Sequence, residues 1–258
     1  MIRVMTGMVF ACLLAGTASA RGEEGANWLV PLGSAVSHTA HICQLKDGAT
    51  MEDIARIDER LHDTLRDRSV TGLRQIVTPL FAVNAGYDYL AFMWSTWEEF
   101  GDLWNWITGT PEGQAMAHAW DDYESCEAVV SSVFPLLRQA AQEVSGPQVA
   151  TAEWCTRKDG ISQEQLAAKH QSIADANREN PLVAWWGVGY LQGGARIGAF
   201  PGEFFHLVTY RDMAAYAGAK QAVADGGWRE RDDYYSAYAD CTGEHVLSVQ
   251  NVFRGNGR

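Results

Sequence analysis

Two short motifs each occur twice in this sequence and divide it into two halves. The motif C-x-x-K-D-G spans residues 43–48 and again 155–160, and the pattern Y-x-x-C spans residues 123–126 and again 238–241. Similar helix and strand signals lie between these motifs in both halves. Self-similarity of this kind is typical of one supersecondary unit that is present twice. This repeat constrains the fold more than any other feature of the chain.

Residues 1–20 have the features of a secretory signal peptide. Arg3 precedes an uncharged stretch at 4–14, and small residues follow up to Ala20. We therefore expect cleavage after Ala20 and a soluble, exported protein that is periplasmic or secreted. The alternative is a lipid anchor on Cys12, because residues 9–12 faintly resemble a lipobox, although Phe10 is bulky for that motif.

The charge balance argues against two classes of partner. The sequence carries 20 Lys and Arg against 32 Asp and Glu, a formal net charge of −12 at pH 7. Loss of Arg3 with the signal peptide makes this −13, because residues 1–20 contain no acidic residue. Phosphate backbones and anionic lipid headgroups bind mainly through clusters of Lys and Arg. We therefore expect neither nucleic acid nor a membrane surface as a partner.

Of the five cysteines, all but Cys12 lie after the signal peptide, at the two ends of each repeat. An even number of cysteines in an exported protein normally indicates disulfides. The repeat favours pairing Cys43 with Cys126 and Cys155 with Cys241 over the other two connectivities. The alternative is a structural zinc site with four cysteine ligands, which usually shows C-x-x-C pairs. The sequence contains no such pair.

In the first half, hydrophobic periodicity and capping motifs predict the order strand, helix, strand, strand, helix, strand. Thr50 opens a capping box, and Pro79 suits an edge strand because proline cannot donate to a ladder. The predicted elements are a strand at 37–45, a helix at 50–67, strands at 75–83 and 87–95, a helical region at 96–123 broken near 109–111, and a strand at 127–134.

The second half predicts the same order. Ser162 opens a full capping box, and Thr209 is expected to cap the later helix as Thr96 does in the first half. The predicted elements are a strand at 149–155, a helix at 162–177, a strand at 182–190 before a glycine turn, a strand at 203–208, a helix from 209 and a strand at 245–253. The predicted boundaries are 37–139 for the first repeat, 140–147 for a linker and 148–254 for the second repeat.

A β-α-β-β-α-β unit resembles the ferredoxin-like fold, a four-stranded antiparallel sheet with both helices on one face. In that fold the last strand lies antiparallel beside the first. Cys43 and Cys155 fall at the ends of their first strands, and Cys126 and Cys241 at the starts of their last strands. The resemblance therefore places each proposed disulfide between adjacent strands.

Each such sheet has an uncovered face that must be buried. Two units in one chain look like the dimeric α+β barrel superfamily, which includes the antibiotic-biosynthesis-monooxygenase-like, EthD-like and chlorite-dismutase-like families. The predicted fold class is α+β, with two fused ferredoxin-like repeats that form an intramolecular dimeric α+β barrel. The resemblance implies a cavity between sheet and helices or within the barrel. Such cavities serve cofactor-independent enzymes, haem proteins and binding proteins, and the fold alone does not choose among them.

The candidate catalytic residues are His41, Glu153 and His206. Glu153 follows His41 by 112 residues, as Cys155 follows Cys43, and strand alternation puts each on the same face as its cysteine. His41 and Glu153 could converge across a pseudo-twofold axis as a base and its orienting partner. The structural alternatives are a polar strand end beside a disulfide for this pair, and a hydrogen-bonded core position for His206.

Aromatic residues are the most unusual feature of the composition, with ten Trp, nine Tyr and nine Phe. Core packing explains most of them, but a pocket lined by aromatics with a few polar groups suits a small apolar or aromatic molecule. The candidate ligand-binding residues are Trp94 and Trp186, with Tyr87, Tyr190 and Asn84 as polar handles.

Two classes of function follow for this exported chain. One is an enzyme that acts on a small organic substrate through the three candidate catalytic residues without a tightly held cofactor. The other is a non-catalytic protein that binds a small apolar ligand, and haem binding is an alternative within either class. The sequence contains no metal-site, nucleophile-elbow or nucleotide-binding motif, so we expect no metal and no resident cofactor. The sequence does not predict the oligomeric state.

Overall fold

Strands and helices follow one another along the chain in nearly the predicted order. The computed structural model describes residues 33–81, 86–139, 147–194 and 200–255. The first half contains β1 (Val36–Leu45), α1 (Met51–Asp67), β2 (Leu73–Phe81), β3 (Tyr89–Ser95), α2 (Trp97–Gly109), α3 (Pro111–Ala117) and β4 (Glu124–Arg138). The second half contains β5 (Gln148–Arg157), α4 (Gln163–Ala176), β6 (Val183–Gly194), β7 (Phe204–Tyr210), α5 (Met213–Ala222), α6 (Trp228–Ala237), β8 (Ala239–Cys241) and β9 (His245–Arg254).

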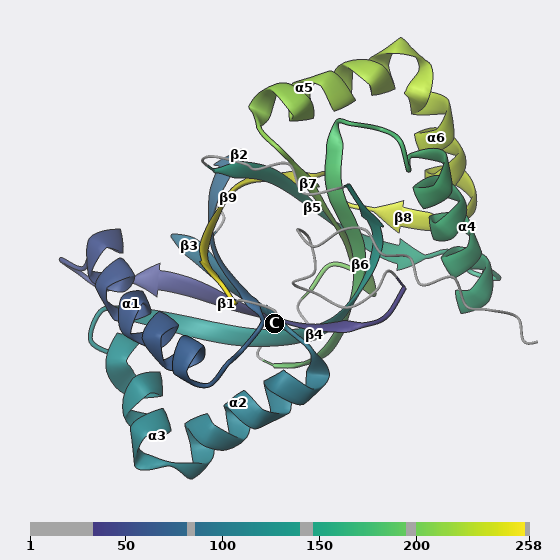
Figure 1. Ribbon diagram of the computed structural model, residues 1–258. Coiled ribbons are helices and arrows are strands. Elements are labelled where there is room, and N and C mark those ends of the chain that lie inside the picture. The colour runs from purple at the N-terminus through teal and green to yellow at the C-terminus, as the bar shows by residue number, and fades with distance from the viewer. Residues whose placement is uncertain (1–32, 82–85, 140–146, 195–199, 256–258) are drawn as a thin grey trace, which may run out of the picture.

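A closed barrel of antiparallel strands forms the centre of the molecule. The strand order is β7-β6-β4-β1-β3-β2-β9-β5, and a further pairing of β5 with β7 closes the sheet on itself. Figure 1 looks into this barrel, with α1, α2 and α3 outside it on one side and α4, α5 and α6 on the other. Each barrel strand therefore has one face toward the lumen and one face outward. The predicted α+β class is confirmed, as is the closed barrel.

The two halves contribute equivalent arcs to this barrel. Their strand orders are β4-β1-β3-β2 and β9-β5-β7-β6, and the pairings of β4 with β6 and of β2 with β9 join them. Because every strand has neighbours on both sides, the barrel leaves no long unpaired edge.

Both predicted disulfides are present. Cys43 pairs with Cys126 across β1 and β4, and Cys155 pairs with Cys241 across β5 and β8. They close loops with sequence separations of 83 and 86 residues. In the chain-entropy picture each stabilises the fold by about 4–5 kcal/mol, an upper figure because native strain subtracts from it.

A buried ion pair joins α1 to the outer face of β2. The guanidinium of Arg74 donates to both carboxylate oxygens of Asp58 at 2.7 and 3.1 Å, and the two side chains are 9% and 3% exposed. A bidentate pair satisfies both charges in the same geometry. The pair therefore fixes the position of α1 on this part of the barrel.

The expectation that Pro79 marks an edge strand is wrong for β2 as a whole. β2 pairs with β9 along its length, and it also pairs with β3 as far as Val77. Pro79 lies beyond that point, where β9 is the neighbour. At Pro79 the strand therefore has a ladder on one side only, as an edge position does.

A second difference from the sequence prediction is the residue that caps α5. Thr209 lies within β7, paired with Ala150 and Trp185, and it caps nothing. The N-cap is Asp212, whose side chain accepts from the N–H of Ala215 at 2.7 Å. The strand runs further than predicted because β5 and β6 pair with it on both sides.

Several expectations fall outside the described residues. They are the signal peptide, residues 140–146 of the linker, and Asn84. Among the described residues, no helix combines the length and the apolar character that a membrane span requires.

Candidate ligand-binding site

Strand alternation decides which side chains of β1 can meet a ligand. His38, Ala40 and Ile42 point into the barrel and line a cavity there. Cys43 has the opposite parity and packs against Ile54 of α1. Residues on one strand therefore divide between two separate environments, the lumen and the layer between sheet and helices.

The lumen contains a cavity of about 270 Å³. An apolar cavity of about 150 Å³ holds benzene, so this one has room for a molecule of two fused aromatic rings. Its wall is mostly apolar and aromatic, which favours ligands of the same character. The main apolar side chains of the wall are Phe92, Trp154, Phe200, Phe205, Leu207 and Leu247.

His38 is the buried titratable group of this wall. It is 4% exposed, and its register partner on β4 is Ser131. Nδ1 of His38 lies 2.9 Å from Oγ of Ser131, whereas Nε2 has no hydrogen-bond partner among the described residues. Burial lowers the pKa of His38 from 6.5 to about 3. The ring is therefore a neutral imidazole at physiological pH.

The contacts of Ser131 assign the tautomer of this imidazole. The Ser131 hydroxyl is also placed to donate to the main-chain carbonyl of His38, at 3.3 Å. A hydroxyl has a single proton, so both contacts are satisfied when the hydroxyl donates to the carbonyl and Nδ1–H donates to Oγ. This assignment leaves Nε2 as a buried acceptor without a partner among the described residues.

Aromatic rings hold the His38 ring in place. The rings of Trp94 and Phe92 lie 4.2 and 4.6 Å from it, centroid to centroid. Trp94 donates its indole N–H to Oε1 of Gln75 at 2.7 Å and packs against Trp185 at 5.5 Å. Of the predicted ligand-binding residues, Trp94 thus lies inside the barrel as part of the packed core beside His38.

Tyr87 and His245 line the outer part of the cavity. Tyr87 is half-buried, and burial raises its pKa. His245 is exposed at the start of β9. An exposed residue in the wall marks the side from which solvent and ligand reach the cavity. The predicted handle Tyr87 therefore lies near this opening.

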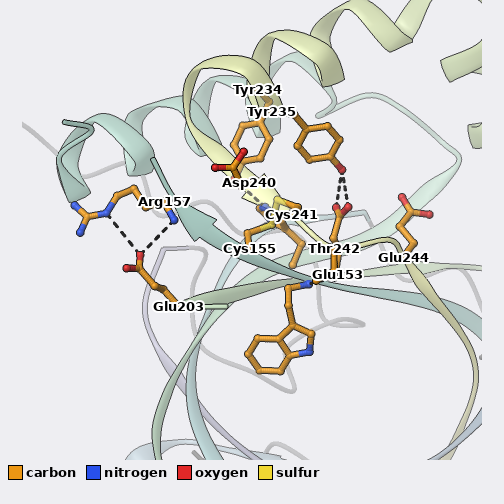
Figure 2. Close-up of a disulfide and its surroundings, with 12 residues drawn as sticks. Glu153, Cys155, Arg157, Glu203, Tyr234, Tyr235, Asp240, Cys241, Thr242 and Glu244 are labelled. Atoms are coloured by element: carbon orange, nitrogen blue, oxygen red, sulfur yellow. Dashed lines mark hydrogen bonds and ion pairs between the residues drawn. A yellow bond between two sulfur atoms is a disulfide. The ribbon is translucent and has the colours of Figure 1, made fainter. Parts of the chain in front are cut away.

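The predicted catalytic residues do not converge on this cavity. His41 faces the α1 side of β1, where burial and the charge of Arg74 lower its pKa to about 4. Glu153 faces α6 and accepts from the hydroxyl of Tyr235 through both oxygens, at 2.7 and 2.8 Å, as Figure 2 shows. These two residues belong to opposite halves, each under its own helices. The closed barrel separates them, which the pseudo-twofold argument did not anticipate.

His206 and Trp186 belong to a hydrogen-bonded chain between the sheet and the helices. Trp186 donates its indole N–H to Nδ1 of His206 at 3.2 Å. Because that nitrogen accepts, Nε2 of His206 must donate, and it lies 3.0 Å from the Tyr234 hydroxyl. Tyr234 then donates to Nε2 of His170 at 2.9 Å. The four groups satisfy one another, so the geometry here is that of a structural network.

Tyr190 also faces away from the lumen. Its hydroxyl accepts from the side chain of Gln163 on α4 at 2.7 Å. Of the predicted binding residues, the barrel therefore brings only Trp94 and Tyr87 to the lumen side within the described part of the chain. Three lining residues were not predicted from the sequence, namely His38, Ser131 and Trp154, although period-two alternation along β1, β4 and β5 was an available signal for them.

A larger hollow of about 490 Å³ lies on the surface between the end of α1 and α2. Arg68 stacks on Trp106 there at 4.8 Å, and both Arg68 and Asp102 are exposed. Among the described residues of its wall, no buried polar atom lacks a hydrogen-bond partner. The lumen is the better candidate because it combines enclosure with an unpaired acceptor.

Comparison with known proteins rests on structure, since no family model and no curated protein matches the sequence. A protein from Fusobacterium nucleatum, provisionally named a monooxygenase, superposes with a TM-score of 0.56 at 7% identity over 86% of this chain and 94% of that one. The chain has the dimeric α+β barrel fold. The resemblance inferred from the sequence is thereby confirmed at the level of the fold.

Two other solved dimeric α+β barrels are less similar. A mutant chlorite dismutase from Candidatus Nitrospira defluvii gives a TM-score of 0.49 at 10% identity over 87% of this chain and 94% of that one. A haem-binding protein from Thermus thermophilus gives 0.46 at 10% identity over 86% and 94%. The expectation of no resident cofactor is corrected on this finding, because a solved dimeric α+β barrel is a haem-binding protein.

Haem binding requires an axial ligand and a cavity large enough for a porphyrin, and the lumen supplies only the first. His38 offers a neutral imidazole whose second nitrogen is hydrogen-bonded, as in axial ligands. The cavity of about 270 Å³ lies below the roughly 300–1,000 Å³ of ordinary ligand pockets, and a porphyrin is larger than most such ligands. The Nε2 atoms of His170 and His206 are already hydrogen-bonded to the Tyr234 hydroxyl. The described residues therefore do not fit a whole porphyrin.

Proposed function

We propose that this protein binds a small, mainly apolar organic molecule inside the barrel. The observation that carries the proposal is a cavity of about 270 Å³ whose apolar and aromatic wall contains one buried, neutral histidine with an unpaired nitrogen. Native proteins rarely leave a buried polar atom without a partner. A bound molecule would bury the apolar wall and leave that nitrogen within reach of a partner.

Binding is a better role for this site than acid–base catalysis. A general base works best when its pKa lies near the operating pH. The pKa of His38 is about 3, some four units below neutral pH, so charging it at pH 7 costs about 5 kcal/mol. His38 is therefore suited to orient a ligand by a hydrogen bond.

We propose in addition that the two halves are ferredoxin-like repeats that arose by duplication, and that the protein is exported. Equivalent strand orders and one disulfide at the same place in each half support the duplication. The signal-peptide features of residues 1–20 and the two disulfides support an oxidising compartment. N-terminal sequencing of periplasmic protein tests export, and a mature chain that begins at Arg21 is expected.

Titration with 1-methylnaphthalene tests the lumen as a binding site, because this probe has two fused rings and no polar group. We expect saturable binding with a Kd in the micromolar range, since about eleven well-packed ligand atoms contribute at most roughly 1 kcal/mol each. Leu191, which lines the cavity opposite Ser131, gives the blocking variant Leu191→Trp.

The matched control is Gln192→Trp, because Gln192 is the next residue along β6 and its side chain is exposed. Binding that survives in Gln192→Trp and is lost in Leu191→Trp supports the lumen. Equal binding by both variants, or no binding by the native protein, contradicts it. An absorption titration with haemin tests the alternative occupant, and a Soret band that depends on His38 would replace this proposal.

A further inference from the structure

We infer that the molecule bound in the lumen carries a neutral hydrogen-bond donor, a hydroxyl or an N–H group, that meets Nε2 of His38. This inference rests on the proposed function and adds the chemical class of the ligand. It depends on the direction of one hydrogen bond, which the contacts of His38 and Ser131 determine. The unpaired atom belongs to a side chain that is 4% exposed and that lines the cavity.

The number of protons on the His38 and Ser131 side chains indicates which of their atoms donate and which accept. Ser131 has one hydroxyl proton, and its oxygen lies near both Nδ1 and the carbonyl oxygen of His38, at 2.9 and 3.3 Å. The arrangement that satisfies both contacts sends the serine proton to the carbonyl and keeps the imidazole proton on Nδ1. Nε2 then presents only a lone pair. A ligand group must donate to pair with it.

The rest of the wall restricts the charge of that group. Trp154, Phe205, Leu207 and Leu247 surround the cavity, and no Lys or Arg is among the described residues that line it. A carboxylate would enter an apolar space without a cation and would bring acceptors only. The net charge of −12 also disfavours anions. The ligand group is therefore a neutral donor on an apolar body.

The position of His38 places this donor deep in the lumen. The His38 ring lies 4.2 Å from the ring of Trp94, a residue of the packed core, whereas Tyr87 and the exposed His245 lie near the opening. A molecule with one polar end enters with that end first. Its apolar body then lies against Phe205 and Leu247.

Comparison of three probes tests the inference on the native protein without any substitution. 1-Naphthol has the donor, 1-methylnaphthalene replaces the hydroxyl by a methyl group of similar size, and 1-methoxynaphthalene keeps the oxygen and loses the donor. Burial alone favours the methyl compound, because it is the more apolar of the two similar molecules. We expect 1-naphthol to bind about tenfold more tightly than either other probe.

The variant His38→Phe should remove this preference, because phenylalanine keeps the aromatic packing and lacks the acceptor. We expect it to bind 1-methylnaphthalene at least as tightly as the native protein does. Native protein that binds 1-methylnaphthalene and 1-naphthol equally, or that binds 1-methoxynaphthalene as tightly as 1-naphthol, overturns the inference and leaves lumen binding intact. If the native protein binds none of the three, the proposed function itself fails.

Discussion

The imidazole of His38 and the hydroxyl of Ser131 lie 2.9 Å apart on directly paired positions of β1 and β4. This contact joins two strands inside a closed barrel, and together with the contact of Ser131 to the His38 carbonyl it assigns the imidazole proton to Nδ1. The consequence is a buried acceptor, Nε2 of His38, without a partner among the described residues. The chemistry of the site thus depends on a pair of small polar groups in a mostly apolar wall.

Replacement of Ser131 by Ala should weaken the recognition of a donor without affecting the apolar part of the site. Without the hydroxyl, the proton of His38 is free to move to Nε2, so we expect about a three- to tenfold loss of 1-naphthol affinity. The affinity for 1-methylnaphthalene should not change. Calorimetric titration of both probes measures the two effects. Ser132→Ala, one residue further along β4 and on its other face, should change neither, and a loss of both affinities in Ser131→Ala contradicts the account.

Tyr234→Phe should destabilise the protein by about 1–3 kcal/mol, because it leaves Nε2 atoms of two buried histidines without a partner. Both His170 and His206 use the Tyr234 hydroxyl. Urea unfolding measures the change in the free energy of unfolding. Tyr238→Phe is the matched control, since no hydrogen bond of the Tyr238 hydroxyl is seen in the described part of the chain, and it should cost less than about 0.5 kcal/mol. Equal costs would mean that the network contributes nothing.

Stability should fall as the pH is lowered from about 6.5 toward 4. Burial lowers the pKa values of His38 and His206 to about 3 and those of His41 and His170 to about 4, from 6.5. In this window the unfolded chain binds more protons than the folded chain, so acid favours unfolding. Each histidine contributes up to about 1.4 kcal/mol per pH unit.

Two buried carboxyl groups oppose this trend. Burial raises the pKa values of Glu124 and Glu153, so the folded chain retains protons on them that the unfolded chain releases. The observed slope should therefore be smaller than the four histidines alone would produce. Urea unfolding at pH 7, 6 and 5 measures the net effect. A free energy of unfolding that is constant or higher at pH 5 would show that these histidines are not buried as neutral groups.

Asp58→Asn should cost about 3–5 kcal/mol, because it leaves the buried guanidinium of Arg74 without its counter-charge. Asp63→Asn removes a similar partner from Arg66 on the same helix. The side chains of that second pair are 72% and 58% exposed, so the expected cost is about 0–1 kcal/mol. Thermal unfolding compares the two variants. Similar losses in both would indicate that burial does not set the strength of the first pair.

Much of the fold could be predicted because its signals are local or repeated. The capping boxes at Thr50, Thr96 and Ser162 form as expected, and the paired cysteines identified neighbouring strands. Pro79 and Thr209 were misjudged because their surroundings come from distant strands. Pro79 lies where the β3 ladder has ended, and the ladders to β5 and β6 extend β7 through Thr209.

The site was harder to predict because both faces of each strand are buried. His38 and His41 lie three residues apart on β1 and therefore face opposite sides, and nothing local says which side contains space. The choice of His41 followed the parity of Cys43, which faces α1. Similarly, consecutive tryptophans on β6 divide, with Trp185 toward the lumen and Trp186 toward His206.

A crystal structure of the protein with 1-bromonaphthalene, using the anomalous scattering of bromine, would locate the bound ligand. We expect one strong bromine peak inside the barrel, in contact with lumen side chains such as Phe205 and Leu247. A peak in the layer between sheet and helices, beside Trp186 or Tyr234, would contradict the account. A structure in which side chains fill the lumen and no bromine is found there would contradict the proposal equally.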